Sequence, residues 1–306
     1  MTDNVAVRSL GKDLETGADA FGTLRRSDAS MARERLAEDG YVYLPGHLDR
    51  DEVLAARGDL VTRLVALGAV APEDPDGGLR TTGTSVAIEA LGRAARGTAT
   101  LQHLLYAPDG ALMRTHGELL GGAVRPYDFT WVRATGPGPG TAAHCDTVYM
   151  GRGTPDVLTT WTPLGDVDRA LGGLLVLERS HRSRNVDPRY LASDVDSFCS
   201  NRHDGAWTTP DGERNHDGDP SGALSHDHVR LRQRLGGRWL TADFQAGDVV
   251  IFGLTTVHAS LDNQTEHGAR LSTDSRYQRA DAPIDERWIG DDPPGHGPQS
   301  GRGTIC

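Results

Sequence analysis

Two short segments of the chain carry side chains that could bind one metal ion. The first contains His144 and Asp146, two residues apart, and the second, much further along, contains His258. On an extended strand, side chains two residues apart point to the same face, so His144 and Asp146 could reach one cation together. Two imidazoles and a carboxylate on one side of a metal are the ligand set of mononuclear non-heme Fe(II) oxygenases. The pattern therefore predicts an iron site made by His144, Asp146 and His258.

Other pairs of histidine and acidic residues fit this ligand set less well. His47-Leu48-Asp49 stands where a strand pattern gives way to a helical one, and Asp49 has the position of a helix N-cap. His116-Gly117-Glu118 lies in a helical pattern, in which residues two apart do not share a face. His226-Asp227-His228 has no strand pattern beside it and is expected in a solvated loop.

The segment that follows His258 predicts where an acidic co-substrate would bind. Residues 261–269 contain Asp-Asn and Gly, which are typical of a hairpin connection. A hairpin centred near Gln264 would place Arg270 directly opposite His258, and cross-strand partners share a face. Ser260 would lie on that face as well, because it is two residues beyond His258. The metal ligand, the guanidinium and the hydroxyl are therefore expected to converge on one pocket.

Arginine suits the far carboxylate of a 2-oxo acid that chelates the iron. Its planar, permanently charged guanidinium binds a carboxylate through two parallel hydrogen bonds, which lysine does not do. We therefore expect Arg270, helped by Ser260, to hold 2-oxoglutarate. The alternative is an ordinary ion pair between Arg270 and Asp274 or Glu266.

Composition narrows the class of protein. The 306 residues can bury a substantial core, and 37% hydrophobic with 25% charged residues is the balance of a soluble globular protein. The net charge of −11 argues against a nucleic-acid partner. We find no apolar run long enough to span a membrane and no secretory signal at the start, so we expect a cytoplasmic protein. Three scattered cysteines (Cys145, Cys199 and Cys306) are too few for a disulfide framework.

The order of the expected elements predicts one α+β domain over residues 1–306, mainly β with flanking helices. We expect a loose polar arm at 1–29 and mainly helical support at 30–122. A β core at 123–290 is interrupted by a polar insert at 183–246, and a flexible tail follows at 291–306. Short strands with Gly, Pro, Asn and Asp turns favour an antiparallel jelly-roll or cupin-type core. A lid or binding loop is the expected role of the insert.

Individual elements follow from hydrophobic periodicity and turn residues. Helices are expected at 30–39, 49–68, 85–96, 101–106 and 111–120, and another near 224–235. Strands are expected at 41–44, 127–134, 157–162, 173–177, 248–252 and 270–277.

A succession of motifs resembles the phytanoyl-CoA dioxygenase family over about Gly40 to Trp288. The motifs are His144-x-Asp146, Trp161-Thr162-Pro163-Leu164, Gly172-Gly173-Leu174, Ser180-His181, Gly247-Asp248, His258-x-Ser260 and Arg270-Leu271-Ser272. The resemblance implies a double-stranded β-helix core and an oxygenase that uses Fe(II), 2-oxoglutarate and O2. It also implies that His144, Asp146 and His258 bind iron, that Arg270 and Ser260 contact 2-oxoglutarate, and that Trp161 lines the co-substrate pocket.

The resemblance implies oxidation of a small-molecule metabolite with release of succinate and CO2. Hydroxylation is the default outcome, and desaturation, cyclisation or epoxidation would use the same residues. Retention of Asp146 favours oxygenation over the halogenation carried out by relatives that lack this carboxylate. Two alternatives remain open at this point, a Zn or Mn cupin-type hydrolase or isomerase and a non-enzymatic jelly-roll binding protein. The sequence leaves the substrate and the oligomeric state open.

Overall fold

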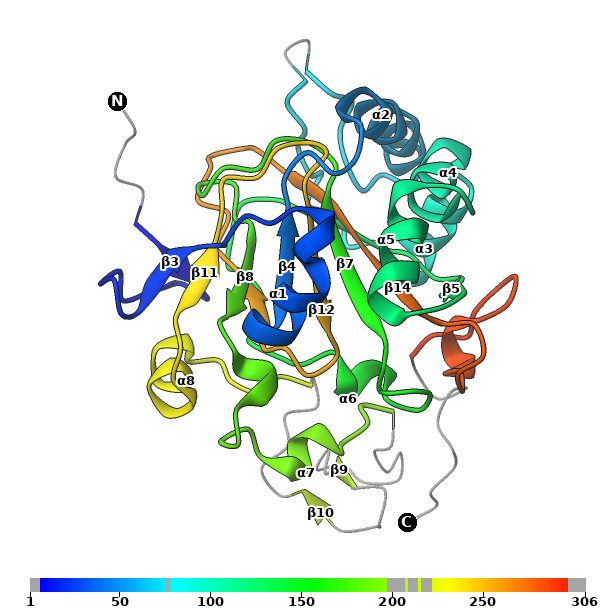
Figure 1. Cartoon of the computed structure of the whole chain (residues 1–306). Coiled ribbons are helices and arrows are strands. Elements are labelled where there is room, and N and C mark those ends of the chain that lie inside the picture. The colour runs from blue at the N-terminus through cyan, green and yellow to red at the C-terminus, as the bar shows by residue number, and fades with distance from the viewer. Residues whose placement is uncertain (1–5, 75–76, 197–206, 209–213, 216–221, 297–306) are drawn as a thin grey trace.

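A six-stranded antiparallel sheet forms the centre of the computed structural model, which describes residues 6–74, 77–196, 207–208, 214–215 and 222–296 (Figure 1). The strands run in the order β4, β12, β7, β14, β5, and β6 also pairs with β14. Their bounds are Tyr41–Leu44 (β4), Val124–Pro126 (β5), Trp131–Thr135 (β6), Leu158–Pro163 (β7), Val249–Gly253 (β12) and Arg270–Arg279 (β14). The strands expected in this sheet lie close to these bounds, except that the strand expected at 127–134 begins only at Trp131, as β6, and β5 precedes the expected range.

A four-stranded sheet lies beside the first, in the order β13, β8, β11, β3. Its strands are Phe21–Thr23 (β3), Leu174–Leu177 (β8), Trp239–Thr241 (β11) and His258–Ser260 (β13). Two of these strands lie in segments where no strand was predicted from the sequence. Strand β3 belongs to the segment expected to be a loose arm, and β11 lies inside the range expected to be an insert. Both segments complete the sheet, because β3 runs parallel to β11 and β11 runs antiparallel to β8.

The two sheets pack face to face through alternate residues of their strands. In β4 and β12, Tyr43 and Phe252 point to the interior between the sheets, where they join Val176 of β8 and Leu240 of β11 in one buried cluster. Their chain neighbours point the other way, as strand geometry requires. This interior is the space in which side chains from both sheets can meet.

Helices cover the opposite face of the six-stranded sheet. The bounds of the helices are Ala32–Asp39 (α1), Arg50–Ala66 (α2), Ile88–Arg96 (α3), Ala99–Tyr106 (α4) and Ala111–Leu120 (α5). Val42 and Ile251 of the sheet pack with Leu60, Leu101 and Leu112 of the helices in a second buried cluster. Figure 1 shows α2 to α5 gathered on one side of β7 and β14. The sheet is therefore buried on both faces.

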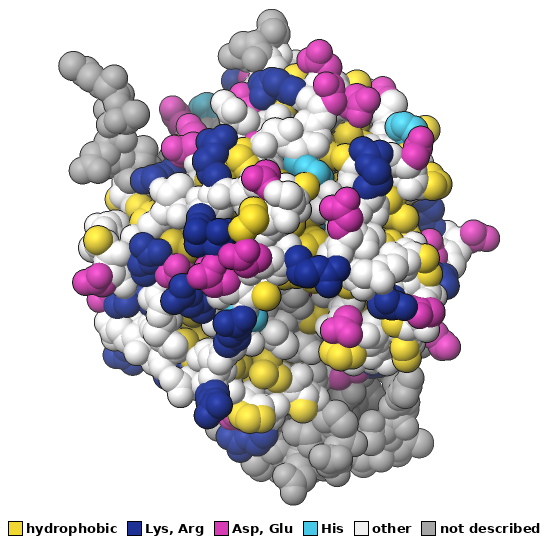
Figure 2. All heavy atoms as spheres, viewed as in Figure 1, with side chains coloured by type: hydrophobic (Ala, Val, Ile, Leu, Met, Phe, Trp, Pro, Cys, Tyr) yellow, Lys and Arg dark blue, Asp and Glu magenta, His cyan; other side chains and the backbone are white. Residues whose placement is uncertain are grey.

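Short elements complete the described chain. They are β1 (Arg8–Ser9), β2 (Lys12–Asp13), α6 (Thr147–Met150), α7 (Pro188–Leu191), β9 (Trp207–Thr208), β10 (Arg214–Asn215), α8 (His228–Leu235) and single 3-10 turns at Ala29–Met31, Ser180–Arg182 and Glu286–Trp288. Leu231 of α8 packs on Leu175 and Leu177 at the outer face of the smaller sheet. Within the described residues, no helix has the length and apolar character needed to cross a bilayer. Figure 2 shows basic and acidic side chains interspersed over one face of the molecule.

The beginning of the C-terminal tail is bound to the rest of the protein. Nδ1 of His296 lies 2.8 Å from Oδ2 of Asp196, and the backbone N–H of Gly295 donates to the carbonyl of Arg287. Residues 291–296 therefore differ from the flexible tail expected there. Residues 297–306, like most of 197–221 in the expected insert, lie outside the described residues.

Helix α2 begins at the N-cap expected from the sequence. The side chain of Asp49 accepts a hydrogen bond of 3.0 Å from the backbone N–H of Glu52. We expect Asp49→Ala to lower the free energy of unfolding by about 1 kcal/mol, the usual contribution of such a cap. Urea unfolding measures this change. Asp51→Ala is the control, because Asp51 lies in the first turn without capping it; equal effects of the two substitutions would contradict the capping role.

Candidate metal centre and co-substrate pocket

His144, Asp146 and His258 converge on one point between the sheets. One ligand atom from each lies within 4.8 Å of the other two. Nε2 of His258 is 3.6 Å and Nε2 of His144 is 3.9 Å from Oδ1 of Asp146. Among the residues that the structure describes, this is the one group of three or more His, Cys, Asp or Glu side chains that meets in this way. Two nitrogens and a carboxylate oxygen are a donor set that fits Fe(II).

Backbone pairing brings the two histidines together, but Asp146 does not lie on a strand. His144 and His258 exchange two backbone hydrogen bonds of 3.0 Å each, which makes them directly opposed residues. After Cys145 the chain turns, and Asp146 has the helical angles φ −65° and ψ −20° at the start of α6. The expectation that His144 and Asp146 share one extended strand is therefore wrong. Instead, the turn before α6 points the carboxylate of Asp146 toward the two histidines.

Each histidine is oriented by a hydrogen bond to a backbone carbonyl. Nδ1 of His144 donates to the carbonyl of Ala142 at 2.8 Å, and Nδ1 of His258 donates to that of Thr256 at 3.0 Å. Since a carbonyl oxygen only accepts, Nδ1 carries the proton and the Nε2 lone pair faces the cation position. Burial and the neighbouring His258 lower the pKa of His144 to about 3, so this imidazole is neutral at pH 7.

The carboxylate of Asp146 is buried and ionised. Its Oδ2 accepts hydrogen bonds from Oγ1 of Thr159 at 2.6 Å and from Nη2 of Arg276 at 3.0 Å. Burial acts to raise the pKa of Asp146, but the Arg276 guanidinium and the two imidazoles outweigh burial and hold it well below its usual range. Arg276 was not predicted from the sequence. It is six residues after Arg270 on β14, an even spacing that places both on one strand face, and this was the available signal.

Arg270 does not lie opposite His258 on a hairpin. His258 pairs with Val176 in the smaller sheet, whereas Arg270 pairs with Thr135 in the larger one. The predicted cross-strand register is therefore wrong, because residues 261–269 cross from one sheet to the other. Arg270 and His258 nevertheless line the same small cavity, which they reach from opposite sheets.

The guanidinium of Arg270 is buried and only partly satisfied. Nη1 donates to the carbonyl of Gly172 and Nη2 to Oγ1 of Thr135, while Nε has no partner among the described residues. Burial, with a contribution from the nearby Arg133, lowers the pKa of Arg270 to about 10. A buried cation of this kind favours the binding of an anion in the cavity.

The ion pairs considered as an alternative for Arg270 are not formed. Asp274 accepts instead from Nε of Arg133 at 2.7 Å, and Glu266 lies 3.4 Å from Nε2 of His267. Within the described part of the chain, no carboxylate lies at ion-pair distance from Arg270.

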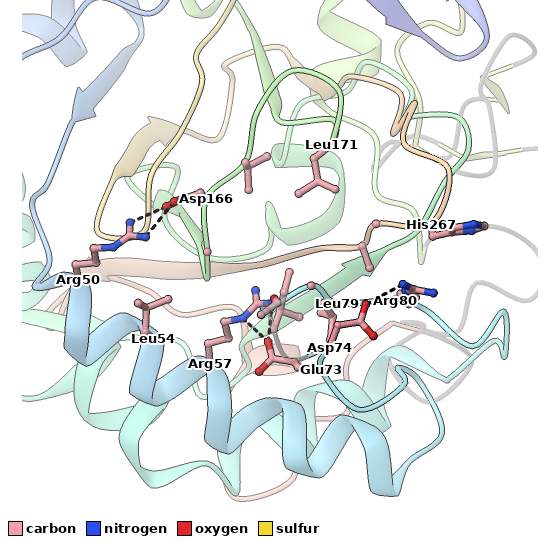
Figure 3. A pocket seen from close by; sticks show the side chains of 17 residues that line it. Arg50, Leu54, Arg57, Glu73, Asp74, Leu79, Arg80, Asp166, Leu171 and His267 are labelled. Atoms are coloured by element: carbon pink, nitrogen blue, oxygen red, sulfur yellow. Dashed lines mark hydrogen bonds and ion pairs between the residues drawn. The ribbon is translucent and has the colours of Figure 1, made fainter.

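A second hollow, between α2 and the loop at 165–171, provides a contrast (Figure 3). Three arginines line it, and each faces a carboxylate. The pairs are Arg50 with Asp166 at 2.6 Å, Arg57 with Glu73 at 2.6 Å and Arg80 with Asp74 at 2.9 Å. The charges that line this second hollow are therefore neutralised within the protein, unlike that of Arg270.

Ser260 and Trp161 also line the cavity beside the metal ligands. Oγ of Ser260 accepts a hydrogen bond of 2.9 Å from the backbone N–H of Thr141. The Trp161 ring is buried and packs on Phe244, with ring centroids 4.6 Å apart. Five of the six residues singled out from the sequence thus line one cavity, and the sixth, Asp146, adjoins it through His258, 3.6 Å away.

Gly172 supports Arg270 through its backbone and has no room for a side chain. Its φ is +81°, and a Cβ would lie 2.7 Å from the carbonyl oxygen of Leu261 and 2.9 Å from the backbone nitrogen of Asn263. We expect Gly172→Ala to destabilise the fold by at least about 1–2 kcal/mol and to weaken 2-oxoglutarate binding, because the carbonyl that orients Arg270 must move. Thermal unfolding and co-substrate titration measure the two effects. Gly253→Ala, where a Cβ meets open space, is the control; an unaltered Gly172→Ala protein would contradict this role.

Comparisons with known proteins agree with this geometry. The family model described as phytanoyl-CoA dioxygenase (PhyH) matches residues 36–271. A 1-deoxypentalenic acid 11-beta-hydroxylase of Streptomyces arenae is 26% identical over an alignment of 265 residues, and the match covers 79% of this chain and 78% of the relative. The enzyme of the same name from Streptomyces exfoliatus is 28% identical over 252 residues, with the same two coverages.

Solved structures share the fold at low sequence identity. The epimerase SnoN from nogalamycin biosynthesis, in a complex with Fe3+, alpha ketoglutarate and nogalamycin RO, superposes with a TM-score of 0.56 at 22% identity, covering 88% of this chain and 94% of that one. EctD from S. alaskensis with 2-oxoglutarate and 5-hydroxyectoine superposes with a TM-score of 0.56 at 16% identity, covering 98% and 92%. Because the family model matches well over half of the chain, this protein belongs to the phytanoyl-CoA dioxygenase (PhyH) family and is a non-heme Fe- and 2-oxoglutarate-dependent oxygenase.

Proposed function

We propose that the protein oxidises a C–H bond of a small-molecule metabolite, with release of succinate and CO2 from 2-oxoglutarate. The names of similar proteins support a metabolite substrate, since they include a hydroxylase, an epimerase and a carbocyclase. Hydroxylation is the expected outcome, and desaturation or ring closure would draw on the same residues. The negative net charge of −11 supports a partner other than nucleic acid. Action in the cytoplasm stays a prediction from the sequence.

In this proposal His144, Asp146 and His258 hold the iron. The observation that carries it is the convergence of their ligand atoms beside the buried guanidinium of Arg270. When bound, iron with O2 and the 2-oxo acid supplies the oxidising power. The protein holds both Nε2 lone pairs and Oδ1 of Asp146 toward one point, beside the cavity that Arg270, Ser260 and Trp161 line.

Arg270, Ser260 and Trp161 bind 2-oxoglutarate in this proposal. The positive charge of Arg270, without a carboxylate partner in the described residues, supports binding of the far carboxylate by two hydrogen bonds. Ser260 can donate its hydroxyl proton to the same group, because its Oγ already accepts from Thr141. The buried ring of Trp161 forms an apolar wall that excludes water.

The wider architecture fits this assignment. We infer that the two facing sheets form a double-stranded β-helix and that residues 1–306 act as a single oxygenase domain. The shared buried cluster between the sheets supports one domain, and the antiparallel pairing of most strands supports the β-helix. Family membership weighs against the Zn or Mn cupin-type hydrolase and the non-enzymatic binding protein.

Turnover of 2-oxoglutarate tests the proposal. Protein purified without O2 and loaded with Fe(II) is expected to develop a weak charge-transfer absorption when 2-oxoglutarate is added, and to form succinate when O2 is admitted. A panel of metabolites is then screened for products that have gained one oxygen atom. An iron-loaded, folded sample that shows neither the absorption nor succinate would overturn the proposal. Activity with Zn or Mn in place of iron would favour the cupin-type alternative.

A further inference from the structure

The two oxygens of the Asp146 carboxylate have different surroundings. Oδ1 faces the Nε2 atoms of both histidines, whereas Oδ2 points away from them toward the larger sheet. A carboxylate is free to bind a cation with one oxygen or with both. Binding with both would occupy a position at the metal that co-substrate or O2 requires.

Two residues that face each other across neighbouring strands hold Oδ2. Arg276 on β14 pairs directly with Thr159 on β7, and directly opposed residues share a face. Their side chains donate to the same oxygen, Thr159 at 2.6 Å and Arg276 at 3.0 Å. The larger sheet thus grips one oxygen of a carboxylate that belongs to a loop.

The guanidinium of Arg276 is itself fixed in place. Its Cζ lies 4.0 Å from the centroid of the Trp131 ring, and Nη1 is 3.4 Å from the carbonyl of Asp274. The side chain is almost fully buried and does not line the cavity of Arg270. A stacked, buried guanidinium gives the carboxylate little freedom to rotate.

We propose that Arg276 and Thr159 are positioning residues that hold Oδ2 of Asp146 and leave only Oδ1 for the metal. This inference rests on the proposed iron site and adds how the site keeps its remaining positions open. Neither residue touches the reacting atoms; both act through Asp146.

Binding of Co(II) to the metal-free protein tests the inference without requiring activity. Thr159→Val removes one donor with little change in shape, and Arg276→Lys removes the planar fork but keeps the charge. We expect each to weaken Co(II) binding by about 10- to 100-fold, the usual effect of losing a group that orients a ligand. Because both donors hold one oxygen, the double variant is expected to lose less than the product of the single losses.

Matched variants and a second readout separate positioning from general stability. Thr162→Val changes a buried threonine on the same strand whose hydroxyl has no partner among the described residues, and Arg50→Lys changes an ion-paired arginine on α2. Both controls are expected to bind Co(II) like the wild type. The d–d absorption of bound Co(II) is expected to shift in the Thr159 and Arg276 variants alone.

Each outcome decides one question. Folded Thr159→Val protein with wild-type Co(II) affinity and an unshifted spectrum would overturn the inference, even if its thermal midpoint fell. If Arg276→Lys does not fold, Thr159→Val and its control decide the question. Failure of the wild type to bind one equivalent of Co(II) would count against the iron site itself.

Discussion

Replacing Arg270 with glutamine is expected to raise the KM for 2-oxoglutarate by about 30-fold or more. Removing one partner of a buried, hydrogen-bonded charge pair costs at least about 2 kcal/mol, and each 1.4 kcal/mol is about tenfold in affinity. Succinate formation at increasing 2-oxoglutarate concentration measures the effect. The matched control is Arg50→Gln on α2, which removes an exposed guanidinium paired with Asp166 and is expected to leave the KM unchanged.

The same substitution is expected to leave the ligand-free fold intact or to stabilise it. Burial lowers the folded-state pKa of Arg270 to about 10, well below the ordinary value of arginine, so folding opposes the protonated guanidinium. For a base with a lowered pKa, this cost is present in full at pH values below about 10 and fades as the pH rises from there toward the ordinary pKa of arginine. At pH 7 the glutamine variant therefore avoids the free-energy cost of burying a charged guanidinium. A lower thermal midpoint together with an unchanged KM would show that Arg270 is structural.

Replacing Asp146 with alanine is expected to abolish stoichiometric iron binding and succinate formation. The expected loss of iron affinity exceeds the roughly 10- to 100-fold loss caused by removing a group that only orients a ligand. The metal-free protein is also expected to lose about 3–5 kcal/mol of unfolding free energy, because Arg276 is left buried without its carboxylate. Iron analysis and urea unfolding measure the two effects.

Asp166→Ala is the control for that experiment. It removes the carboxylate of an exposed ion pair, which contributes at most about 1 kcal/mol, and it lies away from the metal ligands. A variant lacking Asp146 that still bound one iron and formed succinate at the wild-type rate would exclude Asp146 as a ligand.

Elements with a clear local signal were predicted well from the sequence. The helix at 111–120 has the bounds expected from its periodicity, and α2 begins after the Asp49 cap. The strand at 41–44 is correct because its residues are bounded by Gly40 and by Pro45-Gly46. In each of these cases, residues close in sequence determine where the element begins and ends.

Pairings between distant segments were predicted less well. Turn residues between His258 and Arg270 fit a hairpin and equally fit a crossing between two sheets, and the structure has the crossing. The hydrophobic pattern also could not show that Phe21–Thr23 pairs with β11, since a three-residue strand has almost no periodicity. The convergence of His258 and Arg270 was predicted, although by a register that does not occur.

Because residues 261–269 cross between the sheets, the side chains around the metal site come from both sheets. Their convergence therefore requires the two sheets to be packed together. His258 belongs to the smaller sheet, while Thr159 and Arg276, which grip Asp146, belong to the larger one. A cation bound by both His258 and Asp146 would cross-link the smaller sheet to the larger one. Metal loading should then slow the separation of the sheets, and amide hydrogens along β8 and β13 should exchange more slowly in the loaded protein than in the metal-free form.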